Sequence, residues 1–298
     1  LKQLTQATEL PMVTETQPPA PSETDRLLAD VNSQLAEGNV DITNAQQLKQ
    51  MVESLADSRG MVRLGFVEAF GKIGKVASPF LLEALANHPN PVVRRSCGKA
   101  LAKIRDPQGV PTLIDALLND EDTVVKSSAA GALARMGEAA VPKLIEVLES
   151  ADYPQTAKGH ASWALAFIGS DAAEHLYQAI HSESEDVRMA VVGAIANLVD
   201  QPGNDQATEI LLLALKDESV NVRAEAATSV SQLDPQLGVS NLIPLLEDPS
   251  QEVRRRAILS LGKLQDEAAL PALTAKLSDD REEIRQLVKV AIAQIQKG

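Results

Sequence analysis

The stretch from residue 248 to residue 257 reads DPSQEVRRRA, and its central Val-Arg pair recurs along most of the chain. Successive pairs are 30 to 35 residues apart, a period typical of solenoids built from short stacked units. The pairs are Val62-Arg63, Val93-Arg94, Val125-Lys126, Ala157-Lys158, Val187-Arg188, Val222-Arg223, Val253-Arg254 and Ile284-Arg285. The period predicts about eight copies of one repeat, and we call the basic members of these pairs the ladder residues.

An aspartate usually stands six positions before each ladder residue. These positions hold Asp57, His88, Asp120, Asp152, Ser182, Asp217, Asp248 and Asp279, so six of the eight are Asp. The carboxylate of an Asp in a turn can cap the following helix and pair with a neighbouring Arg. We therefore assign this charged ladder to the scaffold rather than to catalysis.

Each ladder residue opens a segment in which apolar residues recur at spacings of three and four, as in Val93, Cys97 and Leu101. Cys97 lies on this apolar stripe, which predicts a small buried hydrophobe rather than a nucleophile. A second apolar segment follows, often with Pro where a first helical turn tolerates it. These prolines are Pro79, Pro111, Pro142 and Pro271. The pattern predicts an all-α fold, an α-solenoid that forms a right-handed superhelix of two-helix repeats, with the ladder helices on one surface.

Composition and charge narrow the classes of function. Hydrophobic residues make up 44% of the chain but aromatic residues only 2%, which suits a core of thin stacked helices. The formal net charge of −13 gives no general attraction to nucleic acid or to an anionic membrane, so neither is an expected partner. A single cysteine excludes an internal disulfide, and no apolar run is long enough to cross a bilayer. We expect a cytoplasmic protein with no membrane insertion.

The chain divides into three parts by composition. Residues 1–22 hold four prolines among Thr, Gln and Glu, which predicts a flexible tail, and a start at Leu1 rather than Met suggests trimming. Residues 23–56 contain two helical patterns without the repeat signature and are expected to cap the stack. Residues 57–298 form the repeat solenoid. The longest step between ladder residues spans residues 200–205, and this insertion either bends the stack or is a neutral surface turn.

The repeat resembles HEAT repeats, and more narrowly the HEAT-like repeats of the phycobilisome lyases, the E/F-type bilin lyases. The resemblance covers residues 57–298 and is carried by stretches such as residues 248–257 and 120–125. It implies a lyase or lyase-like chaperone that holds an open-chain tetrapyrrole, a bilin, and passes it to or removes it from a phycobiliprotein cysteine. It also implies that the ladder helices line a concave groove. A phycobilisome-handling adaptor fits the same resemblance. The alternative is a non-enzymatic scaffold for protein partners, for example in cofactor assembly, with no pigment.

The fourth repeat departs from the others at three positions on one helical face. His160, Trp163 and Phe167 follow the ladder residue by two, five and nine positions, where most other repeats have small or polar residues. They predict an exposed aromatic platform, with Gly131 and Gly193 leaving hollows at the equivalent positions of the neighbouring repeats. The alternative is that Trp163 fills the core between repeats. Tyr153, just before this helix, is a further candidate for contact with a ligand or partner.

The position that holds Phe167 is basic in the first three repeats, where it holds Lys72, Lys103 and Arg135. This short basic track in an acidic chain predicts a guide for anions. The resemblance implies that the aromatic platform would stack the pyrrole rings while Arg135 or Lys103 meets the propionates.

The sequence offers no catalytic signature: it lacks a Gly-rich phosphate loop, a His-Glu-x-x-His motif, paired cysteines and a nucleophile elbow. His175 and His181 are six residues apart, which does not place them on one helical face, so we expect no metal site. We expect no catalytic residues and no tightly bound cofactor, with a bilin as the conceivable ligand. Expected partners are a phycobiliprotein or a second HEAT-repeat subunit. Whether the chain is an enzyme stays open; if it is one, it is a bilin lyase that acts with a partner.

Overall fold

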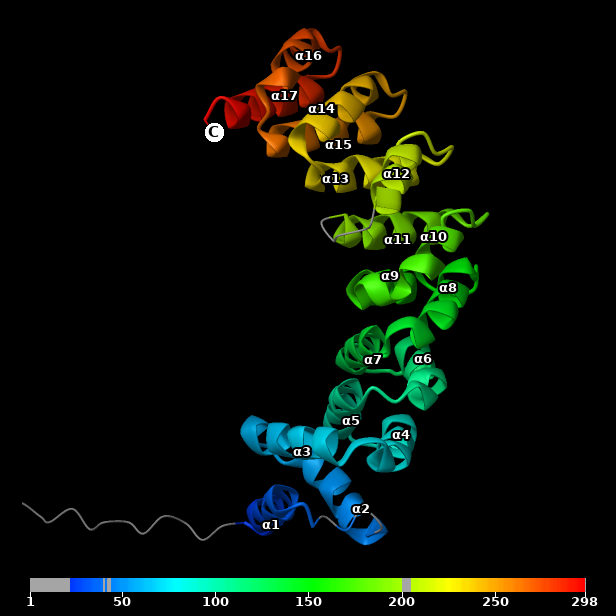
Figure 1. Cartoon of the computed structure of the whole chain (residues 1–298), viewed down its shortest axis with the longest axis vertical. Coiled ribbons are helices and arrows are strands. Elements are labelled where there is room, and N and C mark those ends of the chain that lie inside the picture. Colours follow the sequence, from blue (N-terminus) through cyan, green and yellow to red (C-terminus); the bar gives the residue numbers. More distant parts are fainter. Residues whose placement is uncertain (1–21, 40, 42–43, 200–204, 298) are drawn as a thin grey trace, which may run out of the picture.

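The computed structural model describes residues 22–39, 41, 44–199 and 205–297, and over these ranges it contains helices and turns without any strand (Figure 1). The prediction of an all-α solenoid is confirmed. The predicted flexible tail and the predicted insertion fall largely on residues 1–21 and 200–204, which lie outside the described residues.

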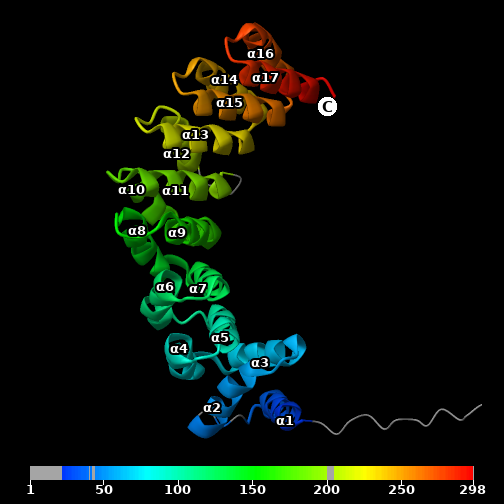
Figure 2. The same cartoon turned by 180° about the vertical axis from the view of Figure 1, so that it is seen from behind.

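The helices form two parallel rows that run the length of the molecule (Figures 1 and 2). The odd-numbered helices form the row that carries the ladder residues, and we call it the inner row because the stack curves around it. It consists of α1 (Glu23–Glu37), α3 (Gly60–Ile73), α5 (Pro91–Ile104), α7 (Thr123–Arg135), α9 (Gln155–Ile168), α11 (Glu185–Ile195), α13 (Val220–Ser229), α15 (Gln251–Leu264) and α17 (Glu282–Ile295). The outer row consists of α2 (Ala45–Glu53), α4 (Ser78–Asn87), α6 (Val110–Asn119), α8 (Val141–Glu149), α10 (Ala173–Ala179), α12 (Asp205–Ala214), α14 (Pro235–Leu242) and α16 (Leu270–Ala275).

Local sequence signals begin the helices where they were expected. Pro79, Pro111, Pro142 and Pro271 lie in the first turns of α4, α6, α8 and α16. A proline there loses no helical hydrogen bond, because the first N–H groups of a helix have no partner within it. On the inner row, Asp122 caps α7 by accepting hydrogen bonds from the amides of Val124 and Val125. The turn residues and the apolar stripes thus define the two-helix repeat together.

The core lies between the two rows and is made mainly of Ala, Val and Leu. Cys97 is fully buried within it, and burial raises the pKa of its thiol to about 12. The prediction that Cys97 acts as a buried hydrophobe is confirmed. Phe66 and Phe70 of α3 are also fully buried, and they fill the core close to the end of the stack.

Ladder residues join neighbouring repeats through ion pairs. Arg94 places its Nε 2.7 Å and its Nη2 2.9 Å from the two carboxylate oxygens of Asp120, and its Nη1 donates to the carbonyl oxygen of His88 at 2.9 Å. The same two-bond pairing joins Arg188 to Asp217 and Arg223 to Asp248. The side chains are almost buried, so each pair, which we call a rung, ties one repeat firmly to the next.

Among the described residues, rungs are absent after the first and seventh repeats, where Arg63 and Arg254 bind only backbone carbonyl oxygens, and after the third and fourth repeats. Lys126 donates to the carbonyl oxygen of Leu118 at 2.7 Å, and no ion pair joins it to Asp152 in the described part of the chain. Lys158 binds Asp186 at 2.5 Å instead of a ladder position, because Ser182 stands where an Asp would be. Rungs are therefore missing on both sides of α9.

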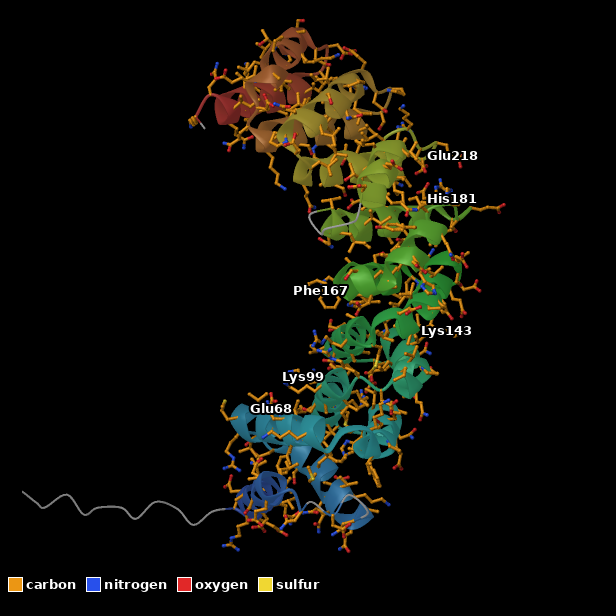
Figure 3. The ribbon with its side chains drawn as sticks, in the orientation of Figure 1. Glu68, Lys99, Lys143, Phe167, His181 and Glu218 are labelled. Atoms are coloured by element: carbon orange, nitrogen blue, oxygen red, sulfur yellow. The ribbon has the colours of Figure 1, made fainter. Side chains whose placement is uncertain are left out.

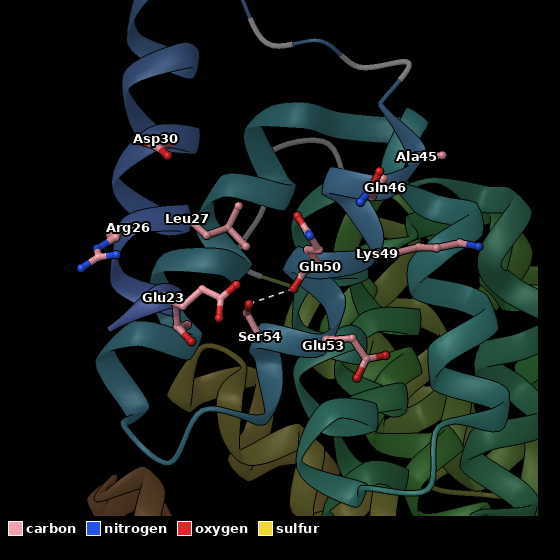
Figure 4. Close-up of a pocket in the computed structure, with 11 residues that line it drawn as sticks. Glu23, Arg26, Leu27, Asp30, Ala45, Gln46, Lys49, Gln50, Glu53 and Ser54 are labelled. Atoms are coloured by element: carbon pink, nitrogen blue, oxygen red, sulfur yellow. Dashed lines mark hydrogen bonds between the residues drawn. The ribbon is translucent and has the colours of Figure 1, made fainter. Parts of the chain in front are cut away.

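The first helix pair takes the terminal place in both rows, since α1 packs on α3 and α2 packs on α4. Leu28 of α1 lies so close to Gly65 that a Cβ on Gly65 would be 2.7 Å from its Cδ2, so glycine allows this close approach. Between α1 and α2 lies a depression of about 880 Å³ with a mixed polar lining (Figure 4). The placement fits a cap, and its boundaries at residues 23 and 56 stay a prediction.

Candidate functional site

Trp163 and Phe167 form a pair of rings on the surface of α9. Trp163 is 45% exposed and Phe167 is 66% exposed, with ring centroids 4.4 Å apart and ring planes inclined by 34°. The buried residues of the same helix are Ala157, Lys158, Ala161, Ala164, Leu165 and Ile168. Trp163 therefore does not fill the core between repeats. Phe167 projects from the inner side of the stack, as Figure 3 shows.

His160 and Tyr153 do not join this pair. His160 is partly buried and turns toward α7, where its Nε2 lies 3.4 Å from the Ser127 Oγ, while its buried Nδ1 has no hydrogen-bond partner. Tyr153 precedes the first turn of α9, whereas Phe167 lies in the last, so about 20 Å of helix separates them. The exposed platform thus consists of Trp163 and Phe167.

The two glycines expected to leave hollows beside Trp163 differ from each other. A Cβ built on Gly131 of α7 would meet no atom within 4 Å, so the space there is open. A Cβ on Gly193 of α11 would lie 3.2 Å from an oxygen of Glu225, so a carboxylate fills that space. The expectation of two hollows is right on the α7 side and wrong on the α11 side.

Lys72, Lys103 and Arg135 line one depression of about 590 Å³ on the inner row, across α3, α5 and α7. Lys99 and Arg105 also line it, and we call this set of five cations the basic depression. The one carboxylate in its lining is Glu68, which pairs with Lys103 at 2.8 Å. The cations therefore outnumber the carboxylates by four in a chain whose net charge is −13.

Lys99 and Arg105 were missed because they stand outside the column that holds the other three. The high density of basic residues between positions 94 and 105 was the signal that could have found them. Lys72, Lys103 and Arg135 lie in the last turns of their helices, where cations interact favourably with the helix dipole by about 0.3 to 1 kcal/mol each. Lys99 stands a turn earlier in α5, so the dipole does not account for it.

The basic depression and the aromatic pair lie on the same side of the molecule. Figure 3 shows Glu68, Lys99 and Phe167 projecting from the inner side, and Lys143, His181 and Glu218 projecting from the opposite side. Since α7 and α9 are neighbours in the row, Arg135 and Phe167 occupy equivalent positions one helix apart. The face thus places a group of cations next to a pair of exposed rings.

The described residues contain neither a group of side chains that could hold a metal ion nor a helix that could span a membrane. No three or more His, Cys, Asp or Glu side chains among them are grouped closely enough to hold a metal ion. His175 instead faces Glu138, with its Nδ1 3.7 Å from a carboxylate oxygen. No helix in these ranges is both long enough and apolar enough to cross a membrane.

Comparison with known proteins agrees with the repeat and with the resemblance. Residues 78–166 and 208–293 match the family of HEAT repeats. Over 217 residues the chain is 37% identical to the bilin biosynthesis protein MpeU of Synechococcus sp. (strain WH8020), covering 72% of this chain and 73% of that protein. The chain is a HEAT-repeat protein of the bilin-lyase-like family.

Solved structures support the fold of this HEAT-repeat protein. A crystal structure of a Kap121p mutant matches with a TM-score of 0.55 and 14% identity, covering 93% of this chain and 36% of that one. A designed armadillo repeat protein matches with a TM-score of 0.36 and 20% identity, covering 83% of this chain and 99% of that one. The first of these likenesses shows the α-solenoid architecture alone.

Proposed function

We propose that this bilin-lyase-like HEAT-repeat protein binds an open-chain tetrapyrrole on its inner row and presents it to a phycobiliprotein. The observation that carries the proposal is the placing of an exposed pair of rings, Trp163 and Phe167, beside the basic depression. An open-chain tetrapyrrole combines flat conjugated rings with two propionate groups. Its conjugated rings match the aromatic pair, and its propionates match the basic depression.

The expected binding energies indicate that the aromatic pair and the basic depression must both contribute to affinity. Aromatic stacking contributes about 0.5 to 1.5 kcal/mol beyond buried area, so the two rings alone give modest affinity. Charge-assisted hydrogen bonds from Lys or Arg to carboxylates add specificity, most of all where Arg binds both oxygens. Arg135 lies on α7, the helix next to that of Phe167, and we assign it and Lys103 to the propionates.

The test mixes the purified protein with phycocyanobilin and follows the visible absorption. A shifted and intensified band is the expected result, and it should weaken in Trp163→Ala. Addition of an apo-phycobiliprotein then separates the possible roles. A covalent adduct on the acceptor makes the chain a lyase, and binding without transfer makes it a carrier.

A second candidate is a scaffold that binds protein partners without pigment. It is favoured by Leu259 and Val290, which occupy the Trp163 position in α15 and α17 and are exposed on the inner row. Two exposed aliphatic side chains in adjacent helices suit a protein surface better than a charged pigment. Absence of a pigment band, together with complex formation with a phycobiliprotein or a second HEAT-repeat subunit, would favour this function.

A further inference from the structure

One carboxyl group on the inner row has no partner of its own. Glu225 of α13 makes no hydrogen bond and no ion pair in the described part of the chain, although it is partly buried. Its Oε1 would lie 3.2 Å from a Cβ on Gly193, so the side chain reaches across from α13 to α11. Partial burial removes some of the water around this carboxylate and no protein donor replaces it, so a ligand that supplies N–H groups can do so.

The charged surroundings of Glu225 are sparse. Burial raises the pKa of this carboxyl, and the positive charge of Arg256 from α15 opposes that effect. Arg256 is itself bound to Glu252, with its Nε 2.7 Å from the carboxylate. From α11 the facing residue is the uncharged Gly193, and no other charged group of α11, α12 or α15 among the described residues acts on Glu225. The carboxylate therefore has acceptor capacity to spare.

The Glu225 carboxylate lies next to the candidate site, one helix beyond the aromatic pair along the inner row. Gly193 occupies in α11 the place that Trp163 occupies in α9, and packed helices lie about 8 to 10 Å apart. In order along the inner row come the basic depression on α3 to α7, the aromatic pair on α9, and the Glu225 carboxylate over α11. The aromatic pair on α9 therefore lies between Arg135 on α7 and the Glu225 carboxylate over α11.

We propose that Glu225 is the counter-ion of the bound tetrapyrrole, accepting hydrogen bonds from its ring N–H groups and stabilising its protonated, cationic ring system. This inference rests on the proposed function and assigns a ligand-binding role to a residue outside the predicted site. No covalent step is involved: the basic ring nitrogen takes its proton from solvent, and the negative charge of Glu225 keeps it there. An opposite charge at 4 to 6 Å shifts a pKa by about 1 to 3 units toward the charged form.

The experiment titrates phycocyanobilin bound to the protein, using the absorption change that accompanies loss of the ring proton. In Glu225→Gln, which keeps the shape and removes the charge, the bound pigment should lose its proton roughly 1 to 3 pH units lower than in the parent protein. Glu174→Gln, at an exposed site on α10 of the outer row, is the matched control and should titrate like the parent. Helicity and melting temperature show that each variant is folded.

A second pair of variants tests the geometry. Gly193→Ala places a methyl group against the Glu225 oxygen, and should displace the carboxylate and lower the pigment's apparent pKa in the same direction. Gly131→Ala adds the same methyl group where nothing lies within 4 Å and should leave the titration unchanged. If the pigment binds but titrates identically in the parent and in Glu225→Gln, the role of Glu225 is refuted alone. If the parent protein binds no pigment, the proposed function and the role of Glu225 both fall.

Discussion

The two halves of the inner row share one scaffold and present different surfaces. The position that holds Phe167 in α9 is basic in α3, α5 and α7. In the C-terminal half it is an uncharged amide in three of four repeats, just after α11, just after α13 and in α17, and a lysine in α15. The C-terminal half has two consecutive rungs, Arg188–Asp217 and Arg223–Asp248, whereas the joint between α7 and α9 has none. The difference teaches that positions on which the repeats agree hold the stack together, while positions on which they disagree line the face that we propose as the binding surface.

Breaking a rung should have the largest effect on this comparison. Asp248→Ala leaves the almost buried guanidinium of Arg223 without its carboxylate, which should lower the free energy of unfolding by about 3 to 5 kcal/mol. Urea denaturation measures the loss. Asp152→Ala is the control from the other half, because Asp152 belongs to no rung, and it should change stability by less than about 1 kcal/mol. Equal losses of stability in the two variants would show that a rung stabilises the stack no more than an Asp outside any rung does.

Removing the exposed indole should separate binding from stability. Trp163→Ala should weaken pigment or partner binding by tenfold or more, and it should cost far less stability than Phe66→Ala in the core, for which we expect about 3 to 5 kcal/mol. Affinity by absorption titration and melting by circular dichroism measure the two effects. Since the sequence has one Trp, its fluorescence gives an independent check. A blue emission maximum that acrylamide quenches poorly would contradict the exposed ring.

Reversing one charge in the basic depression should sharpen the contrast between the halves. Arg135→Glu should lower the affinity for the pigment or for an acidic partner several-fold, more at low than at high ionic strength, and leave folding nearly unchanged. Lys263→Glu is the matched control, since Lys263 occupies the same repeat position in α15 of the C-terminal half. If the two variants bind alike, the basic depression is an ordinary solvated surface.

Lowering the pH should weaken the rungs. The loss of stability from each carboxylate should be the smallest of the predicted effects. Burial raises the pKa of Asp217, but hydrogen bonds from Arg188 and the amide of Ser219 outweigh it and leave the pKa lowered. A lowered pKa means that the stabilisation is complete above the unfolded value of about 4 and is lost as pH falls through the folded value. Urea denaturation from pH 6 down to pH 2 should show a steeper loss in the parent protein than in Asp217→Asn. Parallel curves would mean that this rung contributes nothing to the pH dependence.

Much of the fold was predictable because it repeats. The signature occurs eight times, so an unclear match in one copy does not hide the pattern. The spacing between Arg and Asp also predicted ion pairs between neighbouring repeats. The exposed face of α9 was also predictable, because Trp163 and Phe167 stand where most other repeats are polar or small. Glu225 was not, since its role depends on how far a flexible side chain reaches across a neighbouring glycine. The turn of His160 toward Ser127 likewise depends on packing between helices, which spacing along one helix does not contain.

Under the proposed function, in which the pigment is destined for a thiol, the burial of Cys97 has a chemical consequence. A reactive tetrapyrrole is captured by whichever thiolate it meets first, and the sole sulfhydryl of this sequence is sealed in the core with a pKa of about 12. The residues of this sequence therefore offer no exposed thiol that would compete with an acceptor for the proposed pigment. Any covalent adduct formed through sulfur in its presence must lie on the acceptor.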